Sequence, residues 1–266
     1  MNCKKLLPAL LAAGALFAAS SANATLVPAF SVDKTDSGGA ASFTANLIAG
    51  SYTEVLTVTS LTSFDVSLVF QAGSFNSGAV IGGGSGSPVV ATGLLNNYGL
   101  YAIFNGGGTI STSGSATNFT LSSGTLTAYL DMYGPVTTFD TSGATIGVSG
   151  NSDDKKLGSG TFVQGKGSLT CEDATNNDCG SFGQTTTFAL TPDGKNFFVA
   201  PSPFYGLSIT SGNFNGFTPT VGLTQTLGGV ANVIFTNVPE PSSLALVGLA
   251  LVGLGGVARR RQQKRG

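Results

Sequence analysis

Four acidic residues lie in or beside segments that have the composition of β-strands: Glu54, Asp65, Asp131 and Asp140. Glycosidases need only two carboxyl groups flanking a glycosidic bond, so a secreted polysaccharide-modifying enzyme with a carboxylate pair is one alternative. The chain has no histidine and no tryptophan. This excludes a Ser-His-Asp triad, imidazole base chemistry and sugar stacking on indole rings. We expect no catalytic residues and a non-enzymatic protein.

Sugar binding by weak contacts fits the composition better. Ser, Thr and Asn side chains can hydrogen-bond to sugar hydroxyls, and the tyrosines Tyr98, Tyr101, Tyr129 and Tyr133 can offer ring faces to sugar C–H groups. Such contacts, repeated over many copies, add up to avidity. The composition is therefore compatible with a polysaccharide partner.

Two Asx-rich segments carry oxygen ligands of the kind that Ca²⁺ prefers, although neither has the spacing of an EF-hand. They are Asp153-Asp154 and a loop that contains Glu172, Asp173, Asn176, Asn177 and Asp178. Asx residues also favour turns for backbone reasons alone. Calcium is the one cofactor that the sequence leaves open, and we expect no dedicated metal site.

The cysteines Cys171 and Cys179 flank that loop. In an exported chain, two cysteines eight residues apart favour a disulfide that closes a surface loop. A zinc site would need further soft ligands, which the mature chain lacks.

Residues 160–166 match most of a phosphate-binding P-loop pattern, but Gly167 stands where the pattern requires Ser or Thr. No long helix is expected to follow, so we interpret this match as coincidence.

Alternating apolar and polar residues dominate the chain between residues 25 and 237. For example, Phe64, Val66, Leu68 and Phe70 share one face of a strand. Further strands are expected at 43–48, 52–59, 98–104, 119–121, 126–132, 145–148, 161–163, 185–190, 197–199, 207–210 and 230–235. Clusters of Gly, Ser and Asn at 82–86, 105–108, 111–115 and 153–160 are expected to form turns. We predict an all-β fold, an antiparallel, jelly-roll-like β-sandwich.

The N-terminal residues 1–24 have the pattern of a secretory signal peptide. A short cationic segment precedes an apolar run, and Ala22-Asn23-Ala24 forms a cleavage site before Thr25. The sequence therefore predicts a signal helix that signal peptidase removes during export.

The C-terminal residues 238–266 have three parts. The motif Val238-Pro239-Glu240-Pro241 is followed by an uncharged segment, 242–258, and by a basic tail, 259–266. The uncharged segment is just long enough for a transmembrane helix. Arg259, Arg260 and Arg261 would keep the tail in the cytoplasm and the body on the far side of the membrane.

This tripartite tail resembles the PEP-CTERM sorting signal of Gram-negative bacteria. The resemblance implies recognition by the membrane protease-transpeptidase exosortase near the Pro-Glu-Pro, transient anchoring, and release to the cell surface or matrix. The body, through residues 51–58, 97–102, 179–183 and 201–205, is similar to the flocculation-associated PEP-CTERM proteins of floc-forming bacteria. That similarity implies association with exopolysaccharide and promotion of floc or biofilm formation.

Charge is scarce and acidic. Only 9% of the residues are charged, and residues 25–238 hold five lysines against twelve carboxylates, which argues against a nucleic-acid partner. A self-associating surface protein that uses exposed strand edges is the third hypothesis.

Overall fold

A computed structural model describes residues 27–34, 42–80, 84–114, 116–132, 136–170, 180–214 and 218–237. The predicted signal peptide, the sorting signal, Tyr133, Cys171 and Cys179 all lie outside these residues. The disulfide therefore stays a prediction, as do the calcium ligands of loop 172–178.

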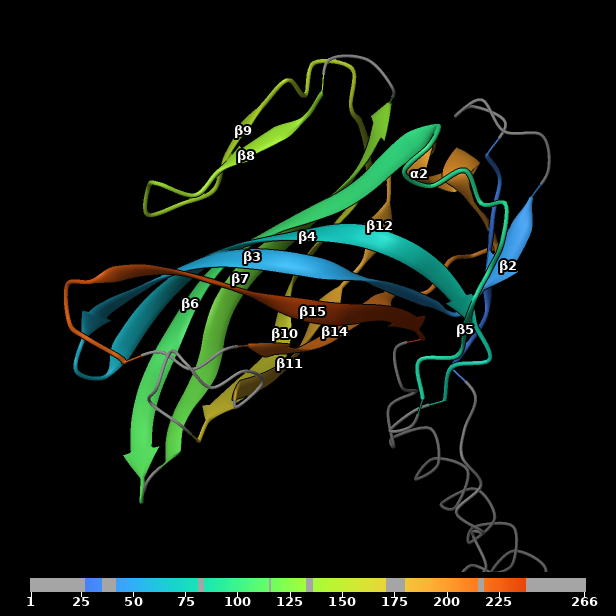
Figure 1. The fold of residues 1–266 in the computed structure, drawn as a ribbon. Helices are drawn as coiled ribbons and strands as arrows, with labels where there is room; N and C mark the ends of the chain where they lie inside the picture. The colour runs from blue at the N-terminus through green and yellow to red at the C-terminus, as the bar shows by residue number, and fades with distance from the viewer. Residues whose placement is uncertain are drawn as a thin grey trace, which may run out of the picture.

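Eight long strands form the main sheet (Figure 1). They are β3 (Leu47–Ser60), β4 (Ser63–Ser77), β6 (Tyr98–Ser113), β7 (Ala116–Met132), β10 (Lys155–Leu169), β11 (Gly180–Thr187), β14 (Leu207–Phe214) and β15 (Thr224–Thr236). They follow one another in the order β11-β14-β15-β3-β4-β6-β7-β10, and every neighbouring pair is antiparallel. The all-β, antiparallel prediction is confirmed.

The sheet closes on itself because β10 pairs on both sides. One edge of β10 pairs with β7, and the other pairs with β11 from Phe162 opposite Thr186 to Leu169 opposite Gly180. The result is an eight-stranded antiparallel barrel in place of the two packed sheets of the predicted sandwich. Alternation of side chains has the same meaning in both architectures, since one face of each strand is buried.

The predicted inward faces line the barrel interior. Phe64, Leu68 and Phe70 of β4 are buried in the main core, together with Leu126 and Leu130 of β7. The segment 160–166 lies within β10, so the P-loop-like pattern belongs to a strand.

Several predicted turns are in fact strand. Residues 105–108 and 111–113 continue β6, and residues 155–160 of the predicted turn 153–160 begin β10. The two predicted strands 119–121 and 126–132 belong to the single strand β7. The glycines are needed there because neighbours approach closely: a Cβ on Gly108 would lie 2.1 Å from the backbone oxygen of Thr120.

A small three-stranded sheet and a short helix pack at one end of the barrel (Figure 1). The sheet consists of β1 (Phe30–Val32), β2 (Phe43–Ala45) and β13 (Phe198–Ala200), and helix α2 spans Pro192–Phe197. Phe30 contacts Phe75 of β4 and Phe235 of β15 edge-on, with ring centroids 6.3 and 5.4 Å apart. These rings join the small sheet to the barrel. The helix was not predicted, and its last residue lies in the predicted strand 197–199.

Three short elements complete the described chain: the strand β5 (Ser87–Pro88), the strand β12 (Ala189–Leu190), and a hairpin of β8 (Thr138–Asp140) and β9 (Gly147–Ser149). The hairpin covers a second apolar cluster on the outer face of the barrel, in which Ile146 and Phe139 pack with Val55, Val69 and Tyr101.

We expect Gly124→Ala to lower the free energy of unfolding by about 1–3 kcal/mol, the usual cost of overpacking a core. A Cβ at this position would lie 2.3 Å from the ring of Phe104, which is 1% exposed. Gly183→Ala is the matched control, because its Cβ would meet no atom within 4 Å. It should leave the stability unchanged or raise it slightly. Urea denaturation followed by circular dichroism measures both, and equal effects of the two substitutions would contradict the packing argument.

Candidate functional site

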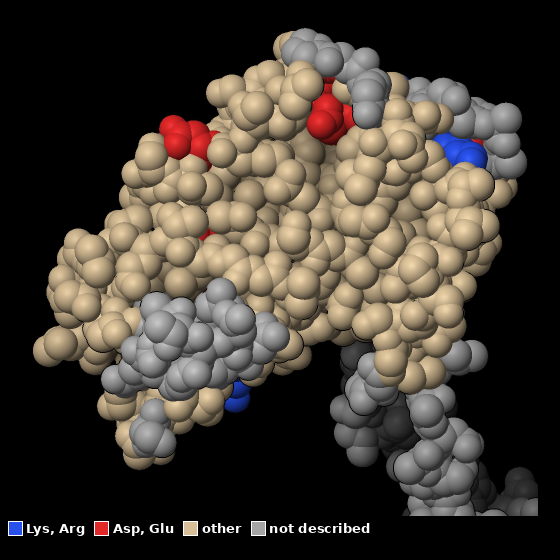
Figure 2. Space-filling model, in the orientation of Figure 1, with Lys and Arg blue, Asp and Glu red and all other residues tan. Residues whose placement is uncertain are grey.

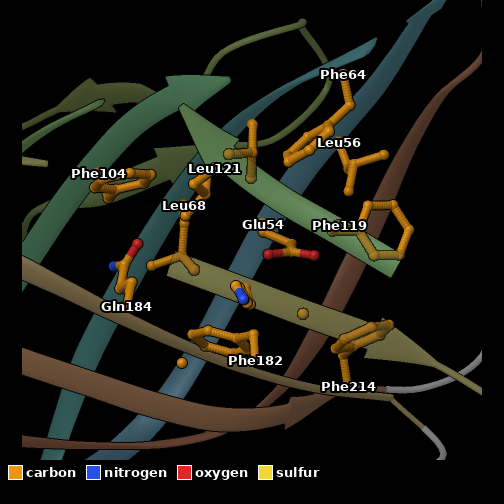
Figure 3. Close-up of a pocket in the computed structure, with 14 residues that line it drawn as sticks. Glu54, Leu56, Phe64, Leu68, Phe104, Phe119, Leu121, Phe182, Gln184 and Phe214 are labelled. Atoms are coloured by element: carbon orange, nitrogen blue, oxygen red, sulfur yellow. The ribbon is translucent and has the colours of Figure 1, made fainter. Parts of the chain in front are cut away.

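The interior of the barrel holds two small cavities of about 60 and 40 Å³. Leu68 and Gln184 line both of them and so mark the boundary. The first cavity, shown in Figure 3, is surrounded by aromatic side chains that include Phe104, Phe119 and Phe182. Small-molecule sites usually have volumes of about 300–1,000 Å³, so neither cavity alone has the size of such a site.

Glu54 extends from β3 into the first cavity, where its carboxyl group lies amid the labelled rings in Figure 3. The residue is 9% exposed, and no hydrogen bond or charge among the described residues offsets the effect of burial on its carboxyl group. Burial disfavours the charged carboxylate and raises the pKa of Glu54 to about 7. Lys166 is the other charged residue that borders this cavity, but its side chain is exposed. Glu54 is therefore a buried acid without a compensating charge.

Two polar cross-strand pairs also face the interior. On β11 and β14, Gln184 lies opposite Thr210 and Thr186 lies opposite Ser208. The hydroxyl oxygens of Thr186 and Ser208 are buried and have no hydrogen-bond partner among the described residues. A buried polar group left in this way costs about 1–3 kcal/mol, so these groups do not serve stability.

A groove of about 440 Å³ lies over β7, β10 and β11. Two rows of paired residues border it, Thr120-Lys166-Gly183 and Asn118-Ser168-Ser181. The Gly183 position carries no side chain, and this leaves the backbone accessible beside the exposed Lys166. The groove combines hydroxyl, amide and ammonium groups, which suit sugar hydroxyls and carboxylates.

The predicted sugar-binding tyrosines occupy different environments. Tyr98 is fully buried and donates a hydrogen bond to the backbone oxygen of Thr92 at 3.1 Å, so it offers no ring face at the surface. Tyr101 is 4% exposed and stacks on the half-buried Tyr129 with ring centroids 5.1 Å apart. Of the three predicted sugar-binding tyrosines that the structure describes, Tyr129 alone can present part of its ring to a ligand.

The structure does not bring the four predicted acids together. Glu54 lies inside the barrel, whereas Asp65, on the outer face of β4, and Asp140, in β8, are exposed. Asp131 is close enough to Asp153 and Asp154 to interact electrostatically. Burial, followed by these two carboxylates, raises the pKa of Asp131, while a hydrogen bond from Thr137 opposes the shift.

Asp131, Asp153 and Asp154 form an acidic group on the outside of the barrel. Asp154 has side-chain hydrogen bonds in this group, and the enzyme hypothesis did not include it. Its carboxylate accepts hydrogen bonds from the Tyr101 hydroxyl at 2.5 Å and from Thr137 Oγ1 at 3.2 Å. No group of three or more acidic or cysteine side chains within the described part of the chain is arranged to hold a metal ion. Calcium binding through Asp153-Asp154 is neither supported nor tested by this geometry.

We expect Thr186→Val to raise the free energy of unfolding by about 1 kcal/mol, because it replaces an unpartnered buried hydroxyl with a methyl group of similar shape. Thr187→Val is the control on the adjacent position. The Thr187 hydroxyl accepts a hydrogen bond from the backbone nitrogen of Thr161 at 2.8 Å, so its loss should lower the stability. Opposite signs in thermal denaturation support the assignment, and destabilisation by both substitutions contradicts it.

Glu54 should make stability fall with rising pH. Since its pKa is higher in the folded chain than in the unfolded chain, the folded state binds more protons between pH 4.5 and about 7. The free energy of unfolding should decrease over this range and then level off. Glu54→Gln should remove this contribution and be more stable at pH 8 by up to about 3 kcal/mol. Asp65→Asn, which changes an exposed carboxylate, should keep the pH dependence in thermal denaturation. A pH profile that Glu54→Gln leaves unchanged would show that the acid is hydrated.

Comparisons with known proteins identify the C-terminal segment. None of the helices in the described ranges has the length and hydropathy of a membrane span; the predicted transmembrane segment 242–258 lies outside those ranges. No curated protein and no solved structure matches the chain. Residues 237–262 match the family model of the PEP-CTERM protein-sorting motif and include the predicted Pro-Glu-Pro and the arginine cluster. The chain therefore carries a PEP-CTERM sorting signal in its C-terminal segment, and this motif implies export and targeting to exosortase.

Proposed function

We propose that this protein is a non-catalytic component of the cell surface or matrix, which associates with exopolysaccharide and promotes floc or biofilm formation. The sorting motif supports the route, because it implies export and transient anchoring through the C-terminal region. The groove over β7, β10 and β11 supports the ligand class and carries the proposal.

The chemistry of the groove fits an acidic polysaccharide. Asn118 and Ser168 offer an amide and a hydroxyl for sugar hydroxyl groups, while the Lys166 ammonium group can pair with a sugar carboxylate. The bare backbone at Gly183 lets a ring approach the sheet closely. Each contact is weak, so affinity would come from many copies on one polymer.

The face drawn in Figure 2 carries little charge that could oppose such an association. Figure 2 shows a face on which uncharged residues dominate and a few acidic and lysine side chains are scattered. Sparse charge limits repulsion from an anionic matrix.

We expect Lys166→Ala to weaken retention of the full chain on an immobilised polyuronate by about fivefold, which corresponds to about 1 kcal/mol. Lys156→Ala is the matched control, since Lys156 is an exposed lysine on the same strand, β10, outside the groove. It should bind as the unchanged protein does. Equal losses in both variants would show that only net charge matters and would overturn the groove assignment.

The same samples separate binding from catalysis. The enzyme alternative has one local observation in its favour, the raised pKa of Asp131 beside Asp153 and Asp154, because a general acid needs such a shift. Release of reducing sugars that Asp131→Asn abolishes would replace the binding proposal with hydrolysis.

Self-association through strand edges has less support, since both edges of each of the eight long strands are paired in the closed sheet. Assembly of the protein without any polysaccharide would favour it.

A further inference from the structure

A second cleft lies beside helix α2, at the end of the barrel that carries the small sheet (Figure 1). Its volume is about 580 Å³, which is within the range of about 300–1,000 Å³ that is usual for ligand sites. Residues of β12, α2, β13 and the segment 201–205 contribute to its walls. Lys195, Val199 and Ser202 are exposed there, so the cleft is accessible from solvent.

The cleft combines an apolar wall with a single charge. The ring of Phe204 is half-buried and packs against Phe198 and Phe235, with ring centroids 5.1 Å apart in both pairs. Lys195 is the one charged residue among the described residues that line the cleft. A uronic acid unit has the matching parts, because its sugar ring has C–H groups on its faces and a carboxylate at its edge.

We propose that this cleft is a second subsite for acidic polysaccharide, and that one polymer chain runs along the outer face of β11 from Lys166 in the groove to Lys195 in the cleft. The inference rests on the proposed function, since it extends the groove over β7, β10 and β11 to a second binding position.

The backbone places the groove and the cleft in line. Both β11 and β12 pair with β10, and the register is the same on the two sides of Phe188: Phe162 lies opposite Thr186, and Ser159 lies opposite Ala189. Residues 180–190 therefore follow one edge of β10 as a single extended segment.

Gly183 lines the groove, Ala189 lines the cleft, and both residues are exposed. They are six positions apart, so they share the outer face of the extended segment. At about 3.3 Å per residue, the distance between them is about 20 Å. A disaccharide is shorter than this distance, and an octasaccharide is longer.

The spacing makes the affinity depend on the length of the sugar chain. Each lysine is exposed, so a single ion pair with a sugar carboxylate is weak. A chain that reaches both lysines makes the second contact within one complex, which raises the affinity without any new kind of contact. The segment 180–190 has no charged residue, so nothing on it repels an acidic chain that lies along it.

The test titrates the full chain with galacturonate oligomers of two and eight units and follows the amide NMR signals of Gly183 and Ala189. The octamer should bind at least tenfold more tightly than the dimer and should shift both signals with one affinity. Lys195→Ala should weaken the octamer about fivefold and leave the affinity of the dimer at Gly183 unchanged. Lys156→Ala is the matched control, because this exposed lysine of β10 lines neither site. It should bind both oligomers as the unchanged protein does.

The outcomes separate this inference from the proposed function. Equal affinities of the two oligomers, no shift at Ala189, or an octamer affinity that Lys195→Ala leaves unchanged would each overturn the second subsite and leave the groove in place. Equal losses in Lys195→Ala and Lys156→Ala would also overturn it, since net charge alone would explain them. If neither oligomer shifts Gly183, the proposed function fails, and the extension of the groove fails with it.

Discussion

Pairing of β10 with both β7 and β11 is the interaction on which the rest of the structure depends. Without the second set of hydrogen bonds, the sheet would have two free edges, and its inner face would need another layer to cover it. With them, the inner face encloses its own core. The same closure removes Glu54 from water. The raised pKa of this residue is therefore a consequence of the topology and not of any neighbouring charge.

The closed sheet also determines where glycine is required. Phe104 occupies space inside the barrel that side chains at Gly106 and Gly124 would otherwise fill; a Cβ at either position would lie within 3 Å of its ring. Large rings and missing side chains are thus complementary across β6 and β7. A glycine-rich chain can in this way have a dense core, and its glycines are distributed along strands as well as between them.

Local alternation made the strands and their buried faces predictable, because a half-buried sheet imposes a period of two. It could not reveal closure, since the β10–β11 pairing depends on contacts across the whole barrel. Residues 105–108, which include three glycines, were predicted as a turn because composition does not show which ring lies beside a glycine. Glu54 could have been recognised: it shares a strand face with Tyr52 and Leu56, both buried, and a charged residue on such a face is exceptional. The burial of Tyr101 could not have been predicted, because it depends on a tertiary contact with the β8–β9 hairpin that covers its cluster.

The inner and outer polar groups of this protein obey different physical requirements. Lys166 borders both the groove and the first cavity, yet its charge is solvated, and its interactions are weak and suited to repeated contacts on a polymer. Glu54 lies across the same wall, where an unpaired charge is costly. One thin sheet therefore separates a solvated ammonium group from a buried carboxyl group whose charged form is disfavoured. Because mobile ions screen exposed charges more than buried ones, salt should affect the electrostatics of Lys166 far more than those of Glu54.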